Sequence, residues 1–166
     1  MNLVQLIVKL NARFLRLVMR LSRQRLLLLF VAFVIINCLC QLIILYFLPT
    51  DFEHPSEKYT LFKQFIMVVI VGPIVETLLF QILILRFILK KITQIEIIAV
   101  VLSAILFGLW HSDNITLIAA GFVSGLTLAI LFFVFRQKKW SPFLYLTLIH
   151  GGFNLVALVI NNILLG

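Results

Sequence analysis

The sequence predicts an all-α membrane protein, a polytopic bundle of about five transmembrane helices preceded by a basic amphipathic helix. Three observations indicate this class. Hydrophobic residues make up 63% of the 166-residue chain and the mean hydropathy is +1.19, whereas a soluble domain is about 45–50% apolar. The apolar residues gather in long segments. The basic residues gather in alternate connections between these segments.

Residues 1–25 form the amphipathic helix. Their basic side chains recur at alternating spacings of four and three residues, which places them on one stripe of a helix: Lys9, Arg13, Arg16, Arg20 and Arg23. Most of the other positions are Leu, Ile, Val, Phe or Met. We expect this helix to lie in the inner membrane interface, where apolar burial and anionic lipid both hold it and fix the topology.

Residues 26–166 form the predicted membrane domain. A helix needs about 20 apolar residues to cross a bilayer, and five segments are candidates: Leu26–Leu48, Leu61–Ile88, Ile97–Trp110, Ile115–Phe135 and Pro142–Leu165. The third of these is short for a span. All five are expected to be helices, because lipid offers no hydrogen-bonding partners to open backbone groups.

The placement of the basic residues fits a membrane rather than nucleic acid, although the net charge is +8. With a cytoplasmic N-terminus, twelve of the fourteen Lys and Arg residues lie inside, and only Lys58 and Lys63 lie outside. Beyond the amphipathic helix, the inner ones follow the second and fourth spans: Arg86, Lys90, Lys91, Arg136, Lys138 and Lys139. This distribution predicts a multi-pass cell-membrane protein with membrane lipid, and no nucleic acid, as a partner.

Cys38 and Cys40 are interpreted as packing residues of the first span. Because they are two positions apart on a helix, their side chains point in different directions. Two such cysteines build neither a disulfide framework nor a zinc ribbon. His54 lies in the polar outer connection and is expected to be solvated.

Polar side chains at membrane depth mark a candidate functional site. Glu76 is the only formally charged residue of the 22 between Lys63 and Arg86. His111 ends the third span, and the fifth contains His150 and Asn154 four residues apart, on one helix face. Counted at about 1.5 Å per residue from the inner end, the three ionisable groups lie at roughly 15, 22 and 16 Å for spans two, three and five. Glu76 and His150 agree in depth and His111 lies somewhat higher, so the three groups converge if the third span is shifted or kinked.

Two interpretations of these residues are open. His and Asn can simply join transmembrane helices, with hydrogen bonds of about 0.6 kcal/mol on average. An acid is different, because placing it at the bilayer centre costs roughly 2.5–3.5 kcal/mol on insertion scales. One glutamate with two histidines and an asparagine at similar depth therefore favours a functional site.

Three short motifs carry a family resemblance. They are ETLLFQ at residues 76–81, FGLWH at 107–111 and HGGFN at 150–154, each on its own predicted helix. Their order and spacing resemble the motifs EExxxR, FxxxH and HxxxN of the CPBP family, which includes CAAX proteases and bacteriocin-processing, abortive-infection-like proteins. The segment GFVSG, residues 121–125, lies between the second and third motifs and is interpreted as a helix-packing element.

The resemblance implies an intramembrane endopeptidase that hydrolyses a peptide bond of a peptide or protein substrate. In such an enzyme Glu76 together with His111 activates a water molecule. His150 and Asn154 stabilise the oxyanion of the tetrahedral intermediate. This assignment agrees with general chemistry, since a carboxylate is a suitable general base and fixed donors act strongly where bulk water is excluded.

The first motif departs from the family pattern. Thr77 stands in place of the second acid, and Gln81 stands in place of the arginine. Both missing groups normally help to orient the site. A non-catalytic bacteriocin-immunity or membrane scaffold protein of the same fold is therefore the alternative function. A small transporter is a third class, but the sequence has neither the inverted repeat nor the paired broken helices of that class.

A metal site is the minority interpretation of the same residues. Glu76, His111 and His150 would make a set of two histidines and one glutamate, as in some zinc hydrolases. The spacing H-E-x-x-H is not present. The resemblance implies a metal-independent glutamate protease, so no cofactor is expected.

The charge distribution leads to a topology prediction. In a variant without Cys38 and Cys40, a cysteine placed at Glu57 should react with a membrane-impermeant thiol reagent added to intact cells, and one placed at Gln137 should not. Labelling at position 137 with protection at position 57 would contradict the cytoplasmic N-terminus.

Overall fold

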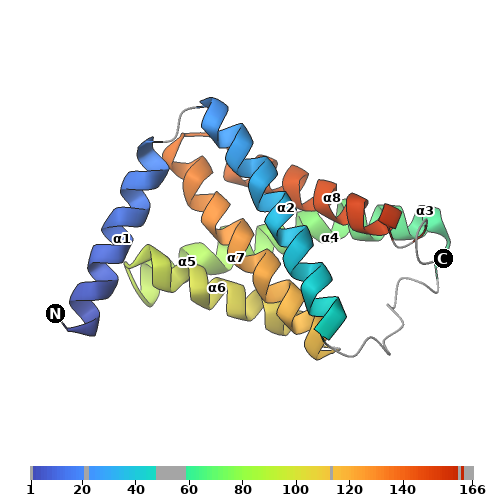
Figure 1. Ribbon diagram of the computed structural model, residues 1–166, viewed down its shortest axis with the longest axis horizontal. Helices are drawn as coiled ribbons and strands as arrows, with labels where there is room; N and C mark the ends of the chain where they lie inside the picture. Colours follow the sequence, from blue (N-terminus) through green and yellow to red (C-terminus); the bar gives the residue numbers. More distant parts are fainter. Residues whose placement is uncertain (1, 21–22, 48–58, 113, 161, 163–166) are drawn as a thin grey trace.

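The computed structural model describes residues 2–20, 23–47, 59–112, 114–160 and 162. Within these ranges the chain is helical and has no strand, which confirms the predicted all-α class (Figure 1). The helices are α1 (Leu3–Arg20), α2 (Arg23–Phe47), a long helix over Leu61–Lys91, α6 (Glu96–Trp110), α7 (Ile115–Gln137) and α8 (Pro142–Ile160).

The long helix alternates between α-helical and π-helical segments: α3 (Leu61–Gln64), η2 (Phe65–Val71), α4 (Gly72–Glu76), η3 (Thr77–Ile84) and α5 (Leu85–Lys91). Pro73 accounts for the change of register at η2, because proline has no N–H to donate. The N–H of Gly72 bonds to the carbonyl of Met67. The carbonyl of Val68 therefore has no donor within the helix. The N–H of Gly72, four residues later, bonds to Met67 instead, and Pro73, five residues later, has no N–H.

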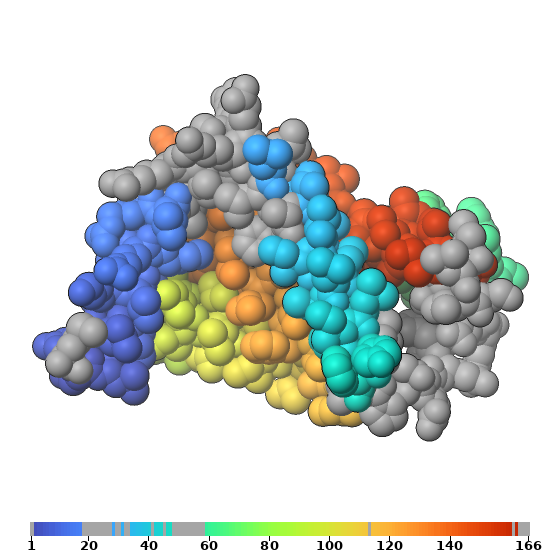
Figure 2. All heavy atoms as spheres, viewed as in Figure 1, coloured from blue at the N-terminus to red at the C-terminus, as the bar shows by residue number. Residues whose placement is uncertain are grey.

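The central helix of the bundle is α7, which packs against α1, α2, α6, α8 and η3. Figure 1 shows α2 crossing α7 on one face. The space-filling view in the same orientation shows α2, in cyan, lying over the orange surface of α7 (Figure 2). α8 packs along η2, α4 and η3, so it runs beside the irregular part of the long helix.

Two glycines of α7 allow α6 to approach closely. A Cβ added at Gly125 would lie 2.8 Å from the Cβ of Phe107, and one at Gly121 would lie 3.0 Å from Nδ1 of His111. Neither position has room for a larger side chain. The packing interpretation of residues 121–125 is therefore confirmed. The two glycines let the Phe107–His111 face of α6 lie directly against α7.

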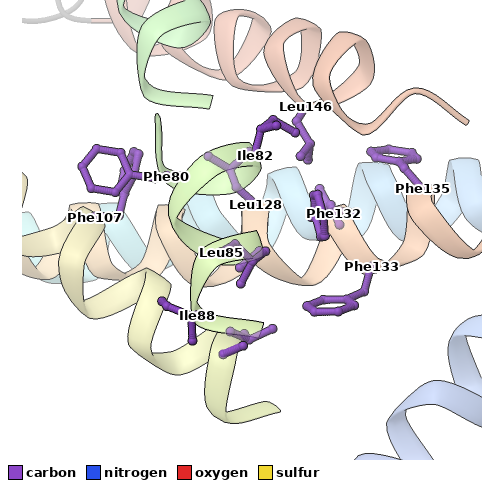
Figure 3. Packing of buried hydrophobic residues seen from close by; sticks show 14 residues of the cluster. Phe80, Ile82, Leu85, Ile88, Phe107, Leu128, Phe132, Phe133, Phe135 and Leu146 are labelled. Atoms are coloured by element: carbon purple, nitrogen blue, oxygen red, sulfur yellow. The ribbon is translucent and has the colours of Figure 1, made fainter. Parts of the chain in front are cut away.

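The apolar core lies where η3, α5, α6, α7 and α8 meet (Figure 3). Leu85, Phe132 and Leu146 are fully buried in it. Figure 3 shows Leu146 of α8 beside Ile82 of η3, and Phe80 beside Phe107 at the end of the cluster. The core thus holds the long helix between α7 and α8.

The N-terminal helix α1 packs against the start of α6 and the end of α7. Asn11 donates from Nδ2 to Glu96 at 2.6 Å and accepts from the backbone N–H of Ile97 at 3.1 Å. Phe14 meets Phe133 edge to face, with ring centroids 6.3 Å apart. These contacts bring α1, which carries Lys9, Arg13 and Arg16, to the end of the bundle at which α7 ends and α6 begins.

Three helices in the described part of the chain are long and apolar enough to cross a membrane: Leu61–Lys91, Ile115–Gln137 and Pro142–Ile160. α6, with 15 residues, is a shorter apolar helix, as is the Val34–Ile44 part of α2. The chain is therefore a membrane protein, and the count of five spans stays a prediction.

Some sequence predictions fall on residues outside the described ranges. These are the outer connection with His54 and Lys58 and the end of the fifth predicted span. Cys38 and Cys40 are described, and both are free and half-buried.

Adjacent glycines of α8 give a matched pair for stability measurements. A Cβ at Gly151 would lie 2.6 Å from the carbonyl oxygen of Val69, whereas one at Gly152 would meet nothing within 4 Å. Gly151→Ala should lower the free energy of unfolding by about 1–3 kcal/mol, the usual cost of overpacking. Gly152→Ala should raise it by up to about 1 kcal/mol through helix propensity. Thermal unfolding in detergent checks this, and equal effects would contradict the close approach of α8.

Candidate functional site

Glu76 is the last residue of α4 and lies at the junction with η3. Its neighbours Val75 and Leu78 are about half exposed on the outer surface of the bundle, while Thr77 and Phe80 are buried. The Glu76 side chain is 19% exposed. It therefore faces the interior of the bundle rather than the surface, although it lies on a membrane-spanning helix.

The carboxylate of Glu76 meets the imidazole of His150. Oε2 of Glu76 lies 3.6 Å from Nε2 of His150, whose side chain is 6% exposed. Gly151 makes this proximity possible, because its missing Cβ lets α8 rest directly on the carbonyl of Val69. The contact is an ion pair only when the imidazole is protonated and the carboxylate is ionised.

His111 follows α6 and lies against α7 beside Gly121. Its Nδ1 is 2.9 Å from the carbonyl oxygen of Phe107. A carbonyl only accepts, so this bond places the proton of the neutral ring on Nδ1 and leaves the lone pair on Nε2. His111 lies close enough to Glu76 and to His150 for a charge on its ring to act on both. The three ionisable groups predicted to converge thus lie within electrostatic reach of one another.

Asn154 contacts the long helix at its irregular segment. Its Nδ2 donates to the carbonyl of Val68 at 2.8 Å. This is the carbonyl that Pro73 leaves without a donor, so the asparagine satisfies a backbone group that the helix itself cannot. An amide nitrogen has two hydrogens, and the second remains available for another acceptor.

Aromatic rings enclose the site on the α6 side. Phe107 lies between the two imidazoles, with ring centroids 5.0 Å from His111 and 5.9 Å from His150. Phe80 packs against Phe107 at 5.2 Å and against Trp110 at 5.7 Å. These rings help to cover the imidazole of His150, which is buried, whereas His111 is only partly buried.

The structure adds two features to the sequence analysis. Glu76 contacts His150 directly, whereas the sequence analysis associated it with His111. Thr77 and Gln81, treated there only as departures from a motif, are fully buried beside the site. Thr147 joins them from α8 with a buried hydroxyl. Thr147 could have been identified from the sequence, because it lies three residues before His150 and therefore on the same helix face.

The metal alternative can be compared with this geometry. Among the described residues, no three His, Cys, Asp or Glu side chains are grouped closely enough to hold a metal ion. The set of Glu76, His111 and His150 therefore does not form a ligand cluster in this conformation.

Comparison with known protein families gives a match that extends from just before the long helix into α8. Residues 58–156 match the family model described as Rce1-like, type II CAAX prenyl endopeptidase. The match covers more than half of the chain and includes all four predicted site residues. It confirms the resemblance carried by the three motifs. No curated protein and no solved structure matches the chain.

The bond between Asn154 and Val68 leads to a double-mutant prediction. Asn154→Ala should lower the free energy of unfolding by about 0.6–1.7 kcal/mol, the range for hydrogen bonds between membrane helices. Pro73→Ala supplies a backbone N–H that can bond to Val68 in the π-helical register. In that background Asn154→Ala should cost less, and thermal unfolding of the two single variants and the double variant measures the coupling. Additive losses would contradict the assignment.

Proposed function

The chain belongs to the Rce1-like family of type II CAAX prenyl endopeptidases, and we propose that it is an intramembrane endopeptidase that hydrolyses a peptide bond of a peptide or protein substrate. The observation that carries this proposal is the contact of the Glu76 carboxylate with His150 at 3.6 Å, enclosed by the bundle. A buried acid on a membrane helix is costly and needs a reason. Water activation supplies one.

In the proposed reaction Glu76 is the general base. It removes a proton from a water molecule as the oxygen of that water attacks the scissile carbonyl carbon. His111 assists at this step, because its Nδ1 is occupied by Phe107 and its Nε2 lone pair is free to accept a proton. The proton then passes to the leaving amine when the tetrahedral intermediate collapses.

His150 and Asn154 are the proposed oxyanion donors. Nε2 of His150 lies 3.6 Å from the carboxylate, and in the tautomer with its proton on Nε2 it can donate to the developing negative charge. Asn154 donates with its second amide hydrogen while the first stays on Val68. Fixed donors of this kind act strongly where bulk water is excluded.

The substrate class follows from where the site lies. A peptide reaches groups enclosed by membrane helices most readily when it is itself held at the membrane. A lipid-anchored or apolar peptide or protein substrate is therefore proposed, and the family description makes prenylated C-terminal segments the first to test.

A non-catalytic immunity or scaffold protein of the same fold is the second candidate. It is favoured by Thr77 and Gln81, two fully buried neutral residues at positions where the resembled motif has an acid and an arginine. Such a protein would bind a peptide or a membrane partner without proton transfer.

Substitution of Glu76 separates the two functions. Glu76→Gln keeps the shape but cannot take a proton, so peptide cleavage by the purified protein should fall by about 10²–10⁴-fold. His111→Ala should be comparably severe. His150→Ala and Asn154→Ala should each lose about 10²–10³-fold if they are oxyanion donors. Glu96→Gln, an acid at the inner end of α6, serves as the control.

The contrary result is a biological activity that survives loss of the base. If cells keep the phenotype conferred by the protein when Glu76→Gln and His111→Ala are combined, with normal amounts of folded protein, the endopeptidase proposal fails. The immunity or scaffold function then takes its place.

A further inference from the structure

Five buried side-chain atoms beside the site have no hydrogen-bonding partner within the described protein: Oγ1 of Thr77, Nε2 and Oε1 of Gln81, Oγ1 of Thr147 and Nδ1 of His150. Thr77 and Gln81 are 0% exposed and His150 is 5% exposed. A buried polar group without a partner is rare and calls for an explanation. Because all five atoms belong to two neighbouring helices, one explanation should account for all of them.

These atoms belong to two helices, the long helix and α8. Thr77 and Gln81 are four residues apart in η3, on one face of the helix. Thr147 and His150 are three residues apart in α8, also on one face. η3 and α8 pack against each other.

The register between the two helices brings both pairs together. Asn154 meets Val68, and His150 meets Glu76, so α8 runs antiparallel to the long helix. One turn further along, Leu146 packs in the same core cluster as Ile82 (Figure 3). Thr147 therefore lies between the level of Glu76 and that of Ile82, the interval that contains the other two polar residues.

Local backbone bonds do not explain the two threonines. A helical threonine commonly donates to the carbonyl four residues earlier, and Thr127 of α7 does so, with Oγ1 2.9 Å from the carbonyl of Val123. Thr77 and Thr147 make no such bond. Their hydroxyls are free to serve a ligand held between the helices.

We propose that Thr77, Gln81, Thr147 and Nδ1 of His150 form an internal water-binding site behind the glutamate–histidine pair. Water fits this set because it donates and accepts at once, and a buried water typically makes about three hydrogen bonds to otherwise unsatisfied groups. The donors and acceptors here are hydroxyls, an amide and an imidazole nitrogen, and none of them is charged.

The imidazole of His150 links this water site to the carboxylate. Its Nε2 faces Glu76 and its Nδ1 belongs to the cluster. A water that donates to Nδ1 fixes the ring as the tautomer with its proton on Nε2. That tautomer is the one required of an oxyanion donor. In this respect the inference rests on the proposed function, and Thr77, Gln81 and Thr147 are positioning residues.

The binding of water is tested without reference to activity. The full chain in detergent micelles, labelled with ¹⁵N in glutamine, should give a cross-relaxation signal between bound water and the side-chain amide of Gln81. The signal is assigned by its loss in Gln81→Met. It should also weaken in Thr77→Val, which keeps the shape and removes the hydroxyl, and persist in Thr77→Ser, which keeps the hydroxyl.

The catalytic contribution is tested with matched substitutions. Thr77→Val and Thr147→Val should each lower kcat about fivefold with KM unchanged, the effect of losing one hydrogen bond of about 1 kcal/mol. Thr77→Ser and Thr147→Ser should stay near the wild-type kcat. Neither valine variant should have a higher melting temperature, because each loses a bond to water.

Two results overturn the inference. No water signal at Gln81, or valine variants that gain thermal stability with kcat unchanged, would mean that these atoms are dry. A water signal together with an unchanged kcat would remove the positioning role. If the wild-type protein cleaves no peptide, the proposed function fails, and the signal at Gln81 still decides whether the water site exists.

Discussion

The site depends on one constraint, which is that Pro73 has no backbone N–H. Because of this, the carbonyl of Val68 has no donor within its own helix, and lipid cannot supply one at membrane depth. Asn154 supplies the missing hydrogen bond from α8, and Gly151 lets the two backbones touch. The same register brings the imidazole four residues before Asn154 to the carboxylate of Glu76. A local defect in one helix thus specifies how a second helix packs against it.

The surroundings of the carboxylate suit the proposed hydrolytic site. Aromatic rings close it on the α6 side, and glycines of α7 hold those rings in place. On the other side lie hydroxyls and an amide that can hold water. In the proposed water site, Thr77 and Gln81 act as neutral groups at the positions where the resembled motif has an acid and an arginine. In this proposal a water molecule, the carboxylate of Glu76 and the imidazole of His150 lie together inside the bilayer.

Much of the fold follows from the sequence alone. α6 and α7 begin and end within two residues of the predicted segments, because polar or basic residues interrupt the apolar ones there. Glu76, His111 and His150 were identified as candidates because acids and histidines are conspicuous at membrane depth, and Asn154 was added because it lies four residues after His150. The direct contact of Glu76 with His150 was not predicted, nor was the bond of Asn154 to a backbone carbonyl. Both depend on the register between helices, which Pro73 and Gly151 determine only once the chain is packed.

The central claim is that Glu76 and His150 form one site, and ¹⁵N spectra of the histidine rings test it most directly. The chain has three histidines, so His150 is assigned by its loss in His150→Ala. Glu76→Gln should shift the His150 ring nitrogens, whereas Glu96→Gln, which alters an acid bonded to Asn11, should not. Unchanged His150 resonances in a folded Glu76→Gln protein would contradict the claim, because they would mean that the carboxylate does not face this imidazole.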